Sequence, residues 1–240
     1  MKILIHYLLV IALTLLSYNT SFAQFKKVKG NGNITTKTHT TSDYYKVAVV
    51  GSMDVILEKG TEGTIRVTTD ENIHEYVTIA SNKGVLKIKI KNYVIINTKK
   101  SIHITIPFTS LDNVSLAGSG SVLTNDQIKS DQIEAEISGS GEMNLDIDVN
   151  RVNAKVNGSA SLKIIGTATD LEIKVIGSGD FDGGSLISQN VEANVTGSGE
   201  ALVVAKSSIK ARVYGSGDIK YLGNPSKSDN KVSGSGDIEG

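Results

Sequence analysis

Hydrophobic and polar residues alternate along most of this chain, and a Gly-Ser pair interrupts the alternation at regular intervals. Apolar residues stand at every second position before each pair, as at Ile133, Ala135 and Ile137. Alternation with period two indicates a β-strand with one buried face, and the period of 3.6 expected for a helix is missing. The pairs are spaced by 21, 19, 19, 20, 18 and 19 residues and begin at Gly118, Gly139, Gly158, Gly177, Gly197, Gly215 and Gly234.

A strand-rich repeat of this length predicts stacked coils. One such unit cannot bury its apolar face alone, so neighbouring units must stack, each about 4.8 Å further along a common axis. A leucine-rich repeat would need a Leu/Asn pattern, and a left-handed hexapeptide helix would need strict coils of about 18 residues. We therefore predict an all-β fold, a right-handed parallel β-helix or β-solenoid with coils of about 19–21 residues.

The Gly-Ser-Gly motif of each repeat is interpreted as an inward bend of the coil. If the alternation of buried and exposed positions continues through the motif, both glycines lie on the buried face. A Cβ there would meet the opposite wall of the coil or be strained by a positive φ. In "VNGSASLKI", Ala160 replaces the second glycine. The second position is therefore expected to accept a small side chain without a positive φ.

The N-terminal half is less regular and begins with a predicted signal peptide, residues 1–23. Lys2 precedes an apolar run from Ile3 to Leu16, and Ser21-Phe22-Ala23 supplies small residues for cleavage. The run has 14 residues, fewer than the ~20 that span a bilayer. We expect export to the periplasm or the cell surface, with no stable membrane span after cleavage.

Residues 24–240 are predicted to form a single domain, with a less regular part at 25–110 and regular coils at 111–240. "VVGSMDVIL" (Val49 to Leu57) resembles a copy of the repeat, and "DENIHEY" (Asp70 to Tyr76) predicts one helical turn. The repeat spacing is not maintained between Gly51 and Gly118. The first part is expected to continue the solenoid.

Several stretches, in their order, resemble a family of exported Bacteroidetes proteins named for a putative auto-transporter adhesin, head GIN domain. They are "YKVAVVGSMDVILEKG", "DENIHEYV", "GVLKIKIK" and "IHITIPFTSLDNVSLAGSGSV", followed by the Gly-Ser-Gly coils. The resemblance implies a right-handed β-helix and adhesion at a surface. It implies no catalytic residues.

Composition narrows the function classes. Lys and Arg number 25 against 25 Asp and Glu, so the basic excess of a nucleic-acid-binding protein is missing. Without Cys the chain has no disulfide and no thiolate metal site. Trp is absent and aromatic residues make up 5%, which weakens a simple ring-stacking platform for sugars.

Outward positions of the coils should form columns along the axis. The middle residue of Gly-Ser-Gly gives a serine column that includes Ser178, Ser198 and Ser216. The position three residues before the first glycine gives a basic column. The position five residues before the first glycine gives a glutamate column, which should lie next to the basic column. The basic column contains Lys155, Lys174, Arg212 and Lys231, and the glutamate column contains Glu134, Glu172 and Glu192.

The position three residues after the first glycine gives an acidic column. Carboxylates one strand spacing apart could bind calcium as a cation ladder, but the same pattern is typical of a solvated face whose charges a neighbouring basic column offsets. We favour the solvated face and expect no metal and no cofactor. The acidic column contains Asp180, Glu200, Asp218 and Asp237.

The sequence favours a non-enzymatic exported solenoid, an adhesin or envelope-binding scaffold whose partner is a surface glycan or protein. Its mature histidines, His39, His74 and His103, are isolated, so no catalytic set is indicated. The alternative is a cell-envelope protein that binds or cleaves polysaccharides with paired acids. We also expect the last coil to leave an open end at which a second copy could pair.

Overall fold

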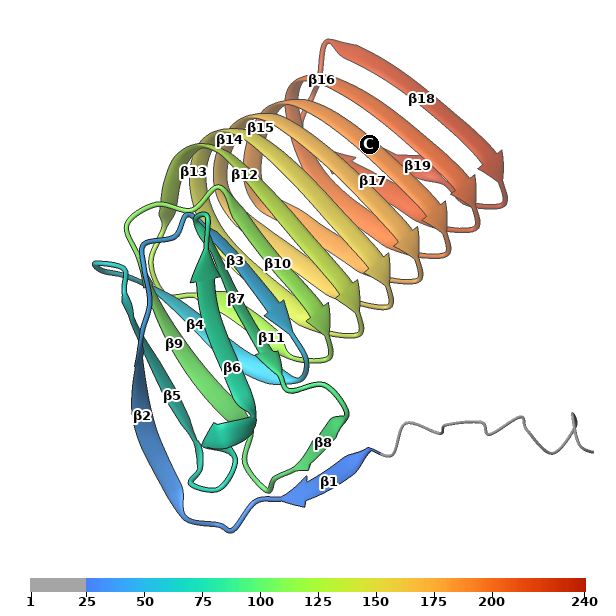
Figure 1. Cartoon of the computed structure of the whole chain (residues 1–240). Helices are drawn as coiled ribbons and strands as arrows, with labels where there is room; N and C mark the ends of the chain where they lie inside the picture. The colour runs from blue at the N-terminus through green and yellow to red at the C-terminus, as the bar shows by residue number, and fades with distance from the viewer. Residues whose placement is uncertain (1–24) are drawn as a thin grey trace, which may run out of the picture.

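The computed structural model describes residues 25–240 (Figure 1). The predicted signal peptide lies outside the described residues. Seventeen strands join one sheet and two form a separate ribbon. Within residues 25–240, no helix is long and apolar enough to cross a membrane.

The regular part is a stack of parallel coils, which confirms the predicted all-β solenoid. The first glycine of each Gly-Ser pair lies beside that of the next coil, as with Gly158 and Gly177, so the repeat spacing is the coil length. The strands are β10 (Asn113–Gly118), β11 (Ser121–Thr124), β12 (Ile128–Gly139), β13 (Glu142–Gly158), β14 (Ser161–Gly177), β15 (Asp180–Gly197), β16 (Glu200–Gly215), β17 (Asp218–Leu222), β18 (Lys227–Gly234) and β19 (Ile238–Glu239).

Each coil has two faces, joined by the Gly-Ser turn on one side and by a bend on the other (Figure 1). Along β13 the side chains alternate between buried and exposed until Asn150 and Arg151, which are both exposed. Gln189 and Asn190 repeat this break in β15. Two consecutive polar residues therefore mark the bend, because a change of direction resets which side of the strand faces inward.

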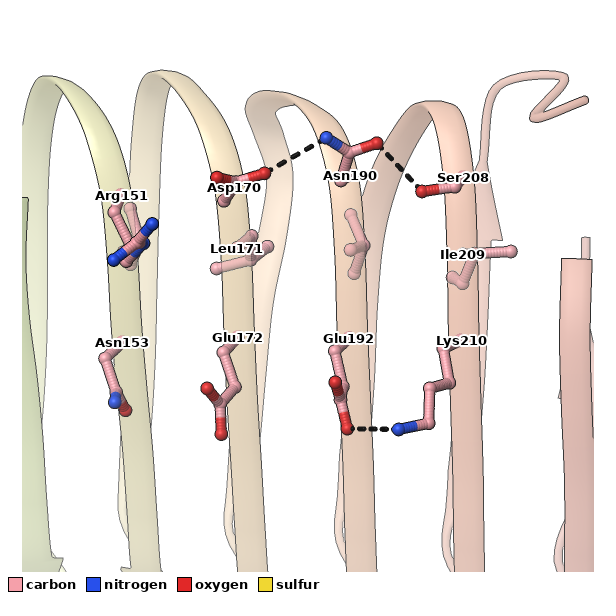
Figure 2. Close-up of a pocket in the computed structure, with 12 residues that line it drawn as sticks. Arg151, Asn153, Asp170, Leu171, Glu172, Asn190, Glu192, Ser208, Ile209 and Lys210 are labelled. Atoms are coloured by element: carbon pink, nitrogen blue, oxygen red, sulfur yellow. Dashed lines mark hydrogen bonds and ion pairs between the residues drawn. The ribbon is translucent and has the colours of Figure 1, made fainter. Parts of the chain in front are cut away.

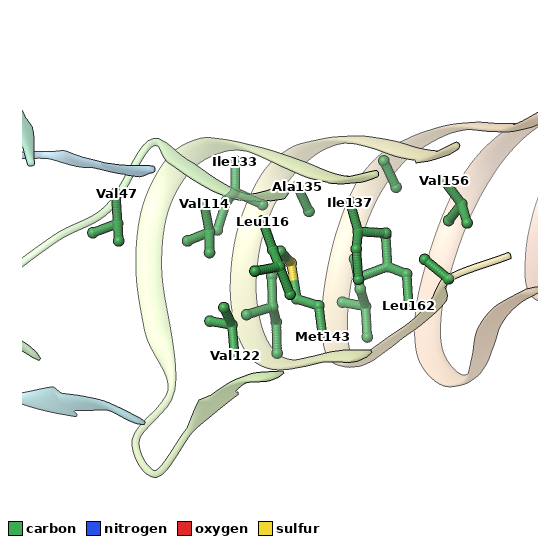
Figure 3. Close-up of a cluster of buried hydrophobic side chains, with 14 of the residues drawn as sticks. Val47, Val114, Leu116, Val122, Ile133, Ala135, Ile137, Met143, Val156 and Leu162 are labelled. Atoms are coloured by element: carbon green, nitrogen blue, oxygen red, sulfur yellow. The ribbon is translucent and has the colours of Figure 1, made fainter. Parts of the chain in front are cut away.

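The core consists of apolar columns between the two faces (Figure 3). Ile137 and Val156 come from the face before the turn, and Met143 and Leu162 from the face after it; all four are at most 1% exposed. Each coil adds one residue to each column, so burial is repeated coil by coil. Complete burial of an aliphatic side chain of this size contributes about 1.5–3 kcal/mol.

The first glycine of each pair has a positive φ, whereas the second does not. In the seven first glycines φ ranges from 94° at Gly158 to 142° at Gly118. Ala160 is buried at the second position, and its backbone lies outside the positive-φ set, as predicted. The prediction that both glycines face inward is wrong for the first, which is partly exposed. Its positive φ turns the chain, so the strand alternation does not carry through it.

The N-terminal part extends the same stack, but not in chain order. One coil, β3 with β4, stacks in parallel on β10 and β11, and β7 and β9 stack on its other side. A Cβ on Gly118 would lie 2.3 Å from the carbonyl oxygen of Gly51, so the two turns are neighbours. The strands are β2 (Ile34–Thr40), β3 (Lys46–Val50), β4 (Met53–Lys59), β5 (Thr64–Asp70), β6 (Val77–Asn82), β7 (Val85–Ile90) and β9 (Ile102–Phe108).

Antiparallel strands extend the N-terminal end of the stack beyond β7 and β9. β6 pairs with β7, β5 pairs with β9, and β2 pairs with β5. The predicted helical turn is a 3₁₀ helix, η1 (His74–Tyr76), between β5 and β6. β1 (Lys26–Lys29) and β8 (Val94–Asn97) form the separate parallel ribbon.

Candidate binding faces of the solenoid

The basic and glutamate columns lie side by side on the face that precedes the Gly-Ser turn. The Nζ of Lys155 lies 2.8 Å from Oε1 of Glu134 in the neighbouring coil. The Nζ of Lys174 lies 2.7 Å from Oε1 of Glu172 in its own strand. Arg212 donates to the carboxylate of Asp229 on β18. The two columns therefore form a charge ladder along the axis; Lys231, on β18, lies beside Arg212.

The ladder lowers the pKa of two of its glutamates. The hydrogen bond from Lys155 is the main cause that lowers the pKa of Glu134, and Asn113 donates a further one at 3.1 Å. The hydrogen bond from Lys210 lowers the pKa of Glu192 in the same way. Each pairing favours the charged form because a donor faces the carboxylate oxygens.

A groove runs along this face where each coil bends, and we call it the axial groove. One stretch is a depression of about 380 Å³ over strands β13 to β16 (Figure 2). A second, of about 470 Å³, continues it toward Tyr45 and Lys46. Both stretches share Arg151, Asn153 and Glu172.

One side of the groove is a row of polar side chains that bond to one another. The Nδ2 of Asn190 donates to Oδ1 of Asp170 at 3.0 Å, and the hydroxyl of Ser208 donates to Oδ1 of Asn190 at 2.8 Å (Figure 2). These residues stand seven positions before the first glycine of each repeat. Sequence reasoning missed this column, although the consecutive polar residues at the bend mark it.

The serine column lies on the exposed edge of the Gly-Ser turns. Ser178, Ser198 and Ser216 are exposed, and their backbone N–H groups each donate at 2.8 Å to the first glycine of the preceding coil. The backbone of this column joins neighbouring coils. Its hydroxyls lie at the surface.

The acidic column lies on the other face, after the turn, and is separated from the basic column by the turn itself. The backbone N–H of Glu200 donates to Oδ1 of Asp180 at 3.2 Å, and that of Asp237 donates to Oδ1 of Asp218 at 2.8 Å. The expectation that the basic column neighbours this acidic column is wrong, because the basic side chains contact the glutamate column instead. No group of three metal-binding side chains was found in residues 25–240. The solvated face stays our prediction for this column, and the cation ladder stays the alternative.

Comparison with known proteins decides the family. The sequence profile described as "Putative auto-transporter adhesin, head GIN domain" matches residues 43–225. The chain belongs to this family. No curated protein matches this head GIN protein.

Solved structures with the same fold come from Bacteroides and Parabacteroides species. A putative adhesin from Bacteroides fragilis is 24% identical, with a TM-score of 0.82 over 88% of this chain and 99% of that one. A putative lipid binding protein from Parabacteroides distasonis is 27% identical, with a TM-score of 0.75 over 89% and 99% of the two chains. A putative adhesin from the same species is 25% identical, with a TM-score of 0.70 over 89% and 99%. The head GIN solenoid is therefore shared across nearly the whole length of these proteins.

Proposed function

We propose that this head GIN protein is an exported, non-enzymatic, adhesin-like binding protein that holds an extended glycan chain in the axial groove. The observation that carries the proposal is the direction of the groove. It crosses seven neighbouring strands, from Lys46 on β3 to Lys210 on β16, a length of about 29 Å at the usual strand spacing. A long polymer can contact every coil along such a groove.

The chemistry of the groove suits recognition of hydroxyl groups. Carboxylates, amides, an arginine and two lysines line the groove, so donors and acceptors both occur along it. At β14 the only polar side chains that the groove presents are the carboxylates Asp170 and Glu172. The adhesin names of two similar structures support binding at a surface.

The lowered pKa values of Glu134 and Glu192 also favour binding over cleavage. A glycoside hydrolase needs one carboxyl group with a raised pKa to protonate the leaving oxygen. The partners of these two glutamates act in the opposite direction. The second candidate function, polysaccharide cleavage, is favoured only by the nearness of Asp170, Glu172 and Glu192 in one depression.

The test is a screen of the exported form of the protein on glycan arrays and on polysaccharides from its own envelope. We expect binding that Arg151→Ala and Asn190→Ala weaken, because both remove groups from the groove. Ser198→Ala and Asp218→Asn are matched controls on the turn columns and should bind normally.

Two results would count against the proposal. Equal loss of binding in the groove and turn variants would show that the groove is not the site. Shortening of a polysaccharide that Glu172→Gln prevents would replace the proposal with the enzymatic alternative.

A further inference from the structure

The ribbon of β1 and β8 carries exposed apolar side chains on its outer side. Lys26 to Lys29 pair in parallel with Val94 to Asn97, so alternation turns Val28, Val94 and Ile96 toward the body of the protein. Val28 is buried, and the other two pack against the core. Phe25, Tyr93 and Ile95 are 55%, 61% and 45% exposed. The rings of Phe25 and Tyr93 lie 6.0 Å apart, and together with Ile95 they form a small apolar patch.

The same ribbon concentrates positive charge. We call residues 25–29 and 91–100 the basic ribbon; they contain six lysines and no acid, in a chain of zero net charge. The ion pairs found within residues 25–240 involve none of these lysines. The six are Lys26, Lys27, Lys29, Lys91, Lys99 and Lys100.

Three of these lysines converge on one depression beside the ribbon. Lys29, Lys99 and Lys100 line a space of about 540 Å³. The acid that also lines it, Asp70, is only 2% exposed and accepts a hydrogen bond from the backbone N–H of Gly32. The accessible charge of the depression is therefore positive, and it suits a phosphate group.

Tyr93 holds a backbone conformation that costs energy. Its φ is 60°, in the left-handed region that non-glycine residues rarely occupy. Its carbonyl oxygen accepts a hydrogen bond from the N–H of Lys26 at 2.8 Å, which ties β1 to the turn before β8. An exposed tyrosine where glycine would be less strained is consistent with a function for its side chain.

We propose that the basic ribbon docks the protein on a bilayer surface with anionic phosphate headgroups. The lysines other than Lys26 neutralise the phosphates, and the apolar patch enters the boundary between headgroups and acyl chains. The Nζ of Lys26 instead donates to the hydroxyl of Tyr76 at 2.8 Å. Charge alone would also fit a dissolved polyanion. The patch of Phe25, Tyr93 and Ile95 favours a bilayer, because rings and an aliphatic chain gain by leaving water. This surface is separate from the axial groove, so the inference stands apart from the proposed function.

The test measures binding of the exported protein, its N-terminus checked by mass spectrometry, to phosphatidylcholine vesicles with and without phosphatidylglycerol. Tyr93→Gly should weaken binding to the anionic vesicles roughly tenfold. Its melting temperature should stay equal or rise, because relief of the left-handed backbone at residue 93 offsets the greater unfolded-state entropy of glycine. Lys83→Gly is the matched control: Lys83 has a φ of 50° outside the ribbon, and this variant should bind normally.

A second pair of variants tests the charge. The double variant Lys99→Gln/Lys100→Gln should lose roughly 25-fold in affinity at low salt. Lys206→Gln/Lys227→Gln removes the same charge from the exposed C-terminal coils and should change little. Equal binding to both vesicle types, or equal losses in ribbon and control variants, would overturn the inference. The inference would also be overturned if soluble polyphosphate displaced the protein completely from the vesicles and Tyr93→Gly left the affinity for polyphosphate unchanged.

Discussion

The two glycines of one Gly-Ser-Gly turn should respond differently to the same substitution. Gly177 and Gly179 stand two residues apart, and an added Cβ would lie 2.5 Å from a carbonyl oxygen of the preceding coil at either position. Gly177 has a φ of 110°, whereas Gly179 lies outside the positive-φ region. Gly177→Ala and Gly179→Ala therefore share an overlap with a carbonyl oxygen. Gly179→Ala adds a contact of 2.8 Å with Cγ1 of Val156, which that side chain can relieve by moving, whereas Gly177→Ala adds backbone strain.

The magnitudes follow from this geometry. Either Cβ must push the coils apart, which stretches a bond such as Ser178 N–H to Gly158 O at 2.8 Å or Asp180 N–H to Ala160 O at 2.9 Å. A weakened hydrogen bond costs each variant about 1 kcal/mol. The left-handed backbone conformation at residue 177 lowers the free energy of unfolding of Gly177→Ala by about 1–2 kcal/mol more. Ala160, which occupies the position equivalent to Gly179 one coil earlier, shows that this fold accepts the second substitution.

Urea unfolding and thermal melting of the two variants and the parent provide the measurement. Gly177→Ala should unfold at lower urea than Gly179→Ala, and its melting temperature should be lower by about 2–8 °C. Equal midpoints, or a more damaging Gly179→Ala, would refute the assignment of positive-φ strain to the first glycine.

Two further predictions concern the charge ladder and the last coil. Glu134→Gln should cost less than about 1 kcal/mol at neutral pH, since the glutamate is partly exposed. Because the folded-state pKa of Glu134 is lowered, its contribution is complete above the unfolded-state pKa and disappears as the pH falls through the folded value. Urea midpoints of variant and parent should therefore converge in acid, and a gap that widens there would contradict the pairing with Lys155. Val232 is 39% exposed, although the equivalent Val195 and Val213 are fully buried. We expect sedimentation to show self-association that rises with concentration and is lost in Val232→Lys; a parent monomeric at every concentration would disprove this.

Local pattern was sufficient to predict the regular coils. Alternation around Ile137 and Val156 predicted which side chains are buried, and the spacing of the glycines predicted the coil length. Ala160 alone distinguished the two glycine positions. These features could be predicted because each coil repeats the same short-range requirements of pleat and turn, so the signal recurs seven times in the sequence.

The order of the coils and the shape of the groove were decided by the tertiary structure. The coil of β3 and β4 lies between β7 with β9 on one side and β10 with β11 on the other. Alternation says that a strand needs a neighbour but not which one, and closing a longer loop costs little more than closing a short one. Likewise, Asp170 and Asn190 read as separate polar residues in the sequence. They become one row of a groove only because each coil bends at the same place and the coils stack in register.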